Sequence, residues 1–432
     1  MPCGFMVEAA KGLVVKRNKL DRSWVVWGLV HVLIFLCLFA VLGQLFYPGP
    51  GEFERQIALK ILDGQVPYSD FVSEYPPLAL LSFLLPALFF RTPLAYYLAF
   101  AAEMLLFDLL AMALIAFVAS HFKISLRRSL AVYTLLLIAV GPLITMRYDL
   151  LPAVLVLAAL TSFMIGRTKT AWAVLALGVT AKLYPVIIAP LFVIYHLRNK
   201  QYNQLIKGGI TFLAVLLVVT LPWLISNPTG FWYSLSYHVE RGLHSESSYA
   251  TVLMIGQLLG LTQVEGEFSF GSWNLRSPLA DSLAGLSSYI SVGSLVILYS
   301  LCTWLLGRRS TSRAGIKMLE SGAAALMFRF ALLAVIILLL TSKIFSPQFL
   351  IWLLPLLPLI NGQQRHTIWL FLVIGGLTWY IFPYHYIEFE LGEPYLIAMV
   401  AARNLLLAVM GILILLPTIH GSEGAFSCLA ER

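Results

Sequence analysis

Carboxylates cluster in one polar stretch of this mostly apolar chain, between residues 51 and 77. Glu52 and Glu54 stand at its start, and Asp70 and Glu74 stand near its end. Carboxylates are costly beside hydrocarbon, so a cluster of them between apolar segments indicates a function. A carboxylate fixed at a membrane surface can act as a general base that takes the proton from an attacking sugar hydroxyl. A solvated loop whose acids merely follow membrane topology would give the same pattern.

A second polar stretch covers residues 240–249 and follows the aromatic run 231–233. It contains Arg241, His244 and Glu246, which we expect to contact a sugar or an acceptor. Aromatic rings beside His, Glu and Ser side chains suit the recognition of a sugar or a lipid headgroup. The rings alone are also typical of the aromatic belt at a membrane interface, and a lone His can be structural.

The apolar stretches around these residues are long enough to span a membrane. The chain has 432 residues, of which 60% are hydrophobic and 12% charged, and its mean hydropathy is +0.86. A soluble protein carries about a quarter charged residues. Runs such as 23–46 and 283–306 reach the ~20 residues that a membrane-spanning helix needs. The sequence therefore predicts an all-α polytopic membrane protein that resides in the lipid bilayer.

Twelve spans are predicted, and the short apolar segment 76–90 is placed at the outer surface as a juxtamembrane helix. Two of the spans are short and broken at 182–185, which predicts a bent hairpin buried in protein. The approximate limits of the spans are 24–46, 94–118, 129–146, 149–165, 170–182, 184–197, 208–225, 282–306, 323–341, 348–361, 367–383 and 395–416.

The net charge of +8 does not indicate a nucleic-acid partner, because the basic residues follow membrane topology. With the N-terminus in the cytoplasm, most of the 29 Lys and Arg fall in cytoplasmic segments and most of the 21 acids fall outside. We expect a cell-membrane protein with both termini cytoplasmic and its site extracytoplasmic. Its parts are a basic tail 1–23, a single transmembrane domain 24–416 with outer loops 47–93, 226–281 and 384–394, and a second tail 417–432.

Charged residues also occur inside predicted spans. Glu103 and Asp108 lie in the second span, and Arg329 lies in the ninth. Ionisable groups in spans are functional candidates by default, and they usually have partners. A Glu or Asp that pairs with the Arg across helices is the more economical interpretation.

Several short motifs resemble those of a known enzyme group, the polyprenyl-phosphate-sugar-dependent glycosyltransferases of the GT-C superfamily. The nearest resemblance is to glycosyltransferase family 87, a mannosyltransferase-like group. It extends over roughly residues 24–416. The stretches that carry it are 61–71 (ILDGQVPYSDF), 74–78 (EYPPL), 147–149 (RYD), 181–185 (AKLYP) and 343–348 (KIFSPQ).

The resemblance implies an inverting transfer of a hexose, mannose in that group, from a polyprenyl-phosphate donor to a lipid or glycan acceptor. The family pattern has an Asp directly after the first span as the catalytic base. In this chain Glu52 or Glu54 takes that place. The leaving phosphate needs no protonation, so a carboxylate base and a cation clamp suffice without a metal or other cofactor. The four cysteines lie outside the outer loops, so no metal cluster is expected.

Further residues receive roles from the same resemblance. Lys182, Arg147 and Lys343 would hold the donor phosphate. Alternatively, Lys182 pairs with Asp149, or Arg147 and Asp149 form a structural salt bridge. The residues implied for sugar or acceptor binding, beside those of the second polar stretch, are Asp70, Glu74, Tyr75, Asp149 and Gln348.

Two other classes of protein fit the same sequence. Twelve spans with intramembrane charges also suit a transporter or lipid flippase, although transporters usually show repeat symmetry and matched broken helices. A polymerase or ligase of lipid-linked glycans would share much of the chemistry and would use a diphosphate donor.

Overall fold

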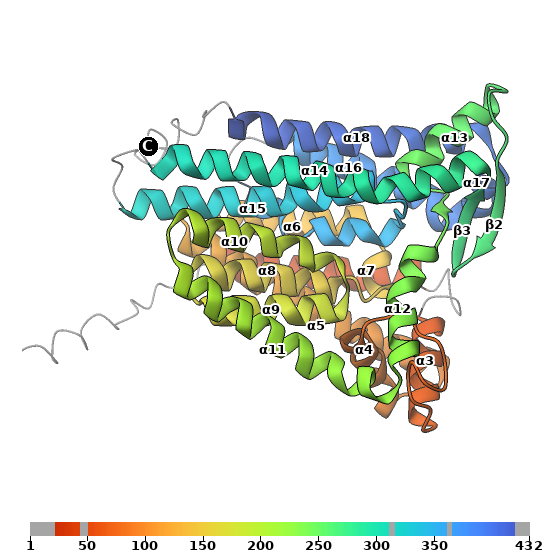
Figure 1. Cartoon of the computed structure of the whole chain (residues 1–432), viewed down its shortest axis with the longest axis horizontal. Helices are drawn as coiled ribbons and strands as arrows, with labels where there is room; N and C mark the ends of the chain where they lie inside the picture. The colour runs from red at the N-terminus through yellow and green to blue at the C-terminus, as the bar shows by residue number, and fades with distance from the viewer. Residues whose placement is uncertain (1–21, 44–50, 311–315, 361–364, 420–432) are drawn as a thin grey trace, which may run out of the picture.

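The computed structural model describes residues 22–43, 51–310, 316–360 and 365–419, and these residues are mostly helical. Six of the described helices are long and apolar enough to cross a membrane, so the protein is membrane-embedded. They run broadly along the long axis of the molecule (Figure 1). These helices are α5 (Pro93–His121), α11 (Tyr202–Ser226), α14 (Pro278–Ser310), α15 (Ile316–Thr341), α16 (Arg365–Trp379) with its continuation η6 (Tyr380–Tyr384), and α18 (Pro394–Ile419).

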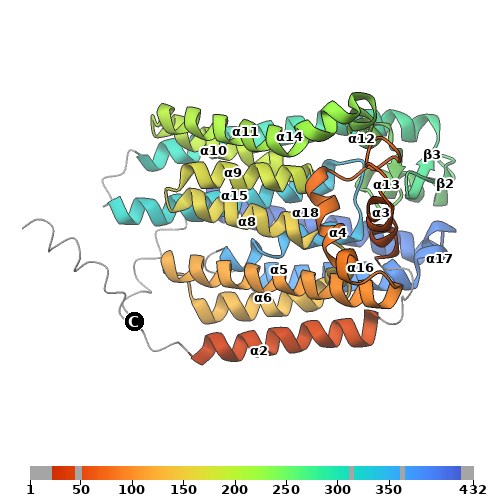
Figure 2. The same ribbon diagram turned by 90° about the horizontal axis from the view of Figure 1, so that it is seen from below.

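Shorter apolar helices pack among these six, and Figure 2 shows α2 at one edge of the molecule beside α6. Each predicted span falls on one or more helical segments of the described chain. The number of twelve spans stays a prediction. The shorter helices are α2 (Arg22–Cys37) with its continuation η1 (Leu38–Gly43), α6 (Leu126–Val140), α7 (Leu143–Met146), α8 (Leu150–Met164), α9 (Thr168–Ala181) and α10 (Ala189–Arg198).

The predicted span 348–361 is not an α-helix. The chain forms two short 3₁₀ helices there, η4 (Pro347–Leu353) and η5 (Leu357–Leu359), and most of their side chains are buried. Pro355 and Pro358 have no N–H to donate, so an α-helical pattern of hydrogen bonds cannot continue through them. Such irregular backbone is tolerated at membrane depth because it lies inside protein.

The predicted break between two short arms lies where the sequence places it. Helix α9 ends at Ala181, Lys182 is extended (φ −160°, ψ 145°), and the 3₁₀ helix η3 (Tyr184–Ile188) leads into α10. Pro185 has no N–H to donate to the carbonyl of Ala181, four residues earlier, so the α-helical hydrogen bonds of α9 cannot continue through it. The break turns the side chain of Lys182 away from the regular helix.

Short helices gather at one end of the molecule, which is called the loop end below (right side of Figure 1). One of them, α4, coincides with the short helix predicted over residues 76–90, while its place at the membrane surface stays a prediction. The structure describes the tails only from residue 22 and up to residue 419, so the predicted tails lie largely outside the described residues. The loop-end helices are α3 (Glu52–Leu62), α4 (Pro77–Phe89), α12 (Pro228–Glu240), α13 (Ser248–Leu258) and α17 (Tyr386–Glu390).

The loop end also holds a three-stranded antiparallel sheet, in the order β1-β3-β2, that the sequence analysis did not predict. Its strands are β1 (Leu243–His244), β2 (Glu265–Ser269) and β3 (Ser272–Arg276). Phe270 and Gly271 form the two-residue turn between β2 and β3, and both have positive φ (53° and 67°). Turns of this kind match the twist of paired strands.

The charges inside the apolar helices do not pair as predicted. Asp108 contacts the His31 ring and accepts a hydrogen bond of 2.5 Å from the Tyr133 hydroxyl, while Arg329 donates to Thr418 at 3.1 Å. Glu103 accepts from the Ser82 hydroxyl at 3.1 Å. Neither Glu103 nor Asp108 therefore pairs with Arg329, in contrast to the predicted ion pair across helices. A buried carboxylate needs hydrogen bonds, but His and Tyr side chains can supply them as well as Arg.

Candidate functional site

One large cavity of about 1110 Å³ opens at the loop end. Side chains from α3, α12, α14 and the β2–β3 hairpin line it, together with chain breaks at 74–76, 182–184 and 342–349. Its volume lies just above the range of about 300–1,000 Å³ that is usual for small-molecule and cofactor sites, so a bulky ligand can fit. The carboxylate-rich stretch, the second polar stretch and the cationic motifs thus contribute to one space, called the loop-end cavity below.

Glu54 lies in the first turn of α3 and lines the cavity, with only 1% of its surface exposed. Gly51 precedes α3 in a left-handed conformation (φ 74°), which glycine adopts without strain. Arg147 Nη1 lies 3.5 Å from Glu54 Oε1, while Oε2 has no hydrogen-bond partner among the described residues. Burial raises the pKa of Glu54, and the Arg147 guanidinium partly opposes that rise. The unpaired oxygen can accept a proton.

Glu52 lies two positions earlier on α3 and does not line the cavity. Its carboxylate accepts two hydrogen bonds from Arg55, from Nη2 at 2.6 Å and from Nε at 2.8 Å. These bonds lower the pKa of Glu52. Of the two carboxylates that the sequence leaves open as a base, Glu54 is therefore the one at the cavity.

Lys182 lines the cavity and is held by a buried acid and a set of aromatic rings. Its Nζ donates to Asp149 Oδ1 at 2.6 Å, and the Trp352 indole N–H donates to the same oxygen at 2.6 Å. The ammonium also lies 4.8 Å from the Tyr148 ring centroid and 5.0 Å from that of Phe349. Cation–π attraction adds to the ion pair in this position. Asp149 thus pairs with Lys182 and not with Arg147, and it does not line the cavity.

Glu74 and Tyr75 line the cavity between α3 and α4. Burial raises the pKa of the Glu74 carboxyl, and Arg241 partly opposes the rise. The Tyr75 ring packs edge-on against Tyr148, with 5.5 Å between the centroids. His238 Nε2 lies 3.2 Å from the Glu74 carbonyl oxygen, to which a protonated nitrogen donates. The contact between His238 and Glu74 connects the first polar stretch to α12.

Lys343 lines the cavity at the end of α12. Its Nζ donates to the carbonyl oxygens of Val239 at 2.6 Å and Arg241 at 2.5 Å, so the ammonium caps the last turn of that helix. The Arg241 Nε donates to the Ser272 hydroxyl of β3 at 3.2 Å. Both cations line the cavity, and both also fix the position of the wall that carries them.

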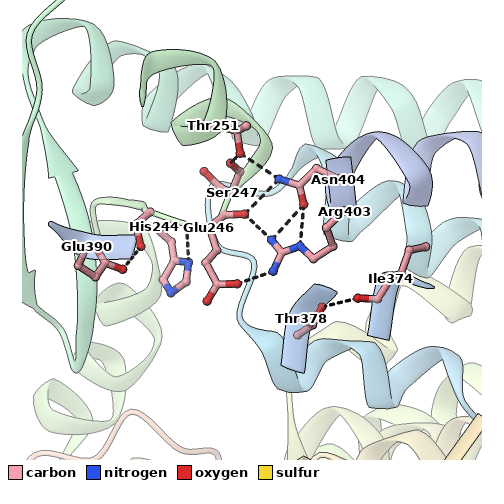
Figure 3. A network of polar contacts seen from close by, with 10 residues as sticks. His244, Glu246, Ser247, Thr251, Ile374, Thr378, Glu390, Arg403 and Asn404 are labelled. Atoms are coloured by element: carbon pink, nitrogen blue, oxygen red, sulfur yellow. Dashed lines mark hydrogen bonds and ion pairs between the residues drawn. The ribbon is translucent and has the colours of Figure 1, made fainter. Parts of the chain in front are cut away.

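His244 and Glu246 have different surroundings although they are two residues apart (Figure 3). His244 lines the cavity, and its Nδ1 accepts a hydrogen bond of 3.3 Å from the Glu246 backbone N–H. Burial lowers the pKa of His244 well below its usual value. Glu246 is buried behind the cavity wall, where its carboxylate pairs with Arg403 of α18. Arg403 also donates to the Glu246 carbonyl at 2.7 Å.

Of the remaining predicted site residues, one lines the cavity and one lies away from it. Gln348 lines the cavity. Asp70 is exposed, and its Oδ2 accepts from the Val66 backbone N–H at 2.7 Å, which closes a local turn. The predicted site residues that the structure does not bring to the cavity are Glu52, Asp70, Asp149 and Glu246.

Sequence reasoning missed two groups of lining residues. Tyr148, Phe349 and Trp352 form the rings around Lys182, and each lies inside or close beside a motif that was singled out for its charge. The second group lines a part of the cavity between η3, α14 and α15 that is largely apolar. Its members are Val186, Ile187, Ser287, Ser288, Ser291, Val292, Leu295 and Leu338. No motif marked them, because helix α14 reads as an ordinary span.

In the part of the chain that the structure describes, no group of three or more His, Cys, Asp or Glu is placed to hold a metal ion. The cavity instead combines a buried carboxylate, several cations and aromatic rings with an apolar extension. No protein-family model matches this chain, and no curated protein sequence matches it.

Proposed function

We propose that the protein is an inverting glycosyltransferase of the GT-C type, similar to glycosyltransferase family 87. In this proposal it moves a hexose, mannose by the family resemblance, from a polyprenyl-phosphate donor to a lipid or glycan acceptor. The observation that carries the proposal is Glu54. Its buried carboxylate has an oxygen with no partner among the described residues, in the same cavity as the side chains of Arg147, Lys182 and Arg241.

The chemistry follows from that combination of charges. The acceptor hydroxyl attacks the anomeric carbon, Glu54 takes the hydroxyl proton, and the bond from that carbon to the phosphate oxygen breaks. The polyprenyl phosphate leaves with the bonding electrons, so negative charge gathers on its oxygens. Arg147 and Arg241 donate hydrogen bonds to those oxygens in a site poor in water, where such donors act most strongly. Attack and departure on opposite faces invert the anomeric configuration.

The role of Lys182 changes from the one that the resemblance implies. Asp149 already neutralises this ammonium at 2.6 Å. We therefore assign the main phosphate contacts to the two arginines, while Lys182 contributes its remaining N–H groups at the edge of the cavity. Lys343, which uses two N–H groups on carbonyl oxygens, is assigned the same secondary role.

The apolar part of the cavity supports a lipid-linked donor. Val186 and Ile187 of η3 face this space together with Val292 and Leu295 of α14. An isoprenoid chain has no polar atoms and gains free energy when it leaves water for such a surface. A water-soluble nucleotide sugar would leave this surface uncovered.

The same proposal includes the membrane arrangement. Twelve spans would place both termini in the cytoplasm and the loop end outside, in the cell membrane. The positive-inside distribution of Lys and Arg supports this orientation. The donor would then enter sideways from the outer leaflet.

Sugar transfer by the purified protein tests the proposal. The protein would be incubated with undecaprenyl- or dolichyl-phosphate mannose and candidate lipid and glycan acceptors, and the product would be analysed by mass spectrometry. Glu54→Gln should lower transfer by about 10²–10⁴-fold, because it removes the base without a large change in volume. Glu52→Gln is the matched control and should retain activity. Full transfer by Glu54→Gln would remove the proposed base.

A further inference from the structure

A second pocket, of about 380 Å³, lies farther along α14, beyond the loop-end cavity. It is formed between the last residue of α10, Arg198, and α14 residues from Val296 to Trp304. The two helices pack against each other and run away from the loop end (Figure 1). The Tyr299 hydroxyl donates to the Ile187 carbonyl at 2.6 Å and stands between the second pocket and the cavity.

Arg198 supplies the charge of this pocket. Its side chain is exposed, and within the described part of the chain it forms no hydrogen bond or ion pair. The guanidinium lies against Gly307 of α14, where a Cβ atom would come within 3.1 Å of Nη2. The glycine therefore lets the guanidinium lie close to the surface of α14, beside the pocket that Arg198 lines.

The hydroxyl groups of the pocket already donate to backbone carbonyls. Tyr299 donates to Ile187, Ser300 to Val296 at 2.8 Å, and Thr303 to Tyr299 at 2.7 Å. Their oxygens remain as acceptors, but their protons are used. Besides the indole N–H of Trp304, the guanidinium is thus the lining group that can donate to a ligand, and its five N–H groups suit the oxygens of a phosphate.

The surroundings favour an anion that carries hydrocarbon. No Asp or Glu occurs between Asp149 and Glu240, whereas Lys200 and Lys207 follow Arg198 closely. Beside the pocket, Val296 is 55% exposed and Ile297 is 72% exposed. A free phosphate would leave this apolar surface uncovered, whereas acyl chains would cover it.

We propose that the pocket binds an anionic phospholipid, with the phosphate on Arg198 and the acyl chains along α14. The site is separate from the loop-end cavity and does not depend on the proposed transfer reaction. Basic pockets between membrane helices suit anionic headgroups, because the local positive field favours a net negative lipid over a zwitterionic one.

Lipid binding to the purified full-length protein in detergent tests the proposal. Short-chain phosphatidylglycerol, phosphatidylcholine and inorganic phosphate would be titrated separately, and bound lipid would be counted by native mass spectrometry beside the thermal shift. Phosphatidylglycerol should bind and raise Tm. Arg198→Gln should weaken this binding roughly tenfold or more, since a charge-assisted hydrogen bond is lost.

Two further variants keep the test decisive. Lys200→Gln removes an equal charge two residues away and should retain binding, and Gly307→Ala, which requires the end of the flexible Arg198 side chain to shift only slightly, should retain it as well. The proposal is overturned if Arg198→Gln binds phosphatidylglycerol as the unchanged protein does, or if Lys200→Gln loses binding to the same extent as Arg198→Gln. It is equally overturned if phosphatidylcholine or inorganic phosphate gives the same response.

Discussion

Glu54 and Arg147 are 93 residues apart in the chain, yet Arg147 Nη1 lies 3.5 Å from Glu54 Oε1 at the wall of the loop-end cavity. The separation exceeds that of an ideal charge-assisted hydrogen bond. Arg147 therefore biases the charge of Glu54 without occupying both of its oxygens, and Oε2 stays unpaired among the described residues. A base needs such an oxygen.

The pH dependence of transfer should report this relationship. Glu54 acts as a base only when it is deprotonated, and burial raises its pKa. Loss of kcat/KM on acidification should therefore begin at a higher pH than for an exposed Glu. Arg147→Gln removes the positive charge that lowers this pKa, so the loss should move to still higher pH. Arg55→Gln should leave the midpoint unchanged, and an unchanged midpoint in Arg147→Gln would contradict the assignment.

The Lys182–Asp149 pair should be essential for stability. Asp149→Asn leaves the Lys182 ammonium without its buried partner and should lower the free energy of unfolding by about 3–5 kcal/mol. Lys182→Met leaves the carboxylate unpaired, with a similar expected cost. The double variant should lose less than the sum of the two single losses. Denaturant unfolding in detergent measures all three, and strictly additive losses would argue against a coupled pair.

The buried ion pair between Arg403 and Glu246 should also stabilise the folded protein. Arg403→Met should lower the free energy of unfolding by about 3–5 kcal/mol, because Glu246 is buried with no other charged partner in the described chain. The control is Arg276→Gln, which breaks the exposed pair with Glu267 at 2.9 Å and should cost less than about 1 kcal/mol. Equal losses of unfolding free energy in Arg403→Met and Arg276→Gln would contradict the expected difference between the buried and the exposed ion pair.

Two adjacent glycines of α16 test the packing of the helices. A Cβ at Gly375 would lie 2.2 Å from the Ala139 carbonyl oxygen of α6, whereas nothing lies within 4 Å of a Cβ at Gly376. Gly375→Ala should cost about 1–3 kcal/mol or more, because backbone has to move. Gly376→Ala should be neutral or stabilising by up to about 1 kcal/mol. Thermal unfolding of both variants decides this, and similar Tm values would mean that the helices do not pack as described.

Much of the fold follows from local sequence. Run length and hydropathy predicted where apolar helices lie, and six of the described helices meet both conditions. The break at Lys182 was also predictable, because Pro185 lacks the N–H that would extend the helix beyond Ala181. The 3₁₀ path through Pro355 and Pro358 follows from the same chemistry, but the length of that apolar run concealed it.

The choice of the cavity residues depended on packing. Glu52 and Glu54 are equivalent by composition and nearly so by position, but residues two apart on a helix point in widely different directions. One of them therefore meets Arg55 on its own helix, and the other meets Arg147 from a distant segment. No local signal records which face of α3 is covered.

The sequence by itself determined that the chain enters a membrane, that a helix breaks at residues 182–185, and which stretches carry the charges, because these properties depend on neighbouring residues. The tertiary structure decided that Asp149 pairs with Lys182, that Glu246 is buried and pairs with Arg403, and that α14 lines the apolar part of the loop-end cavity. These outcomes depend on which helix faces meet, and a buried charge finds its partner among the groups that packing brings within reach.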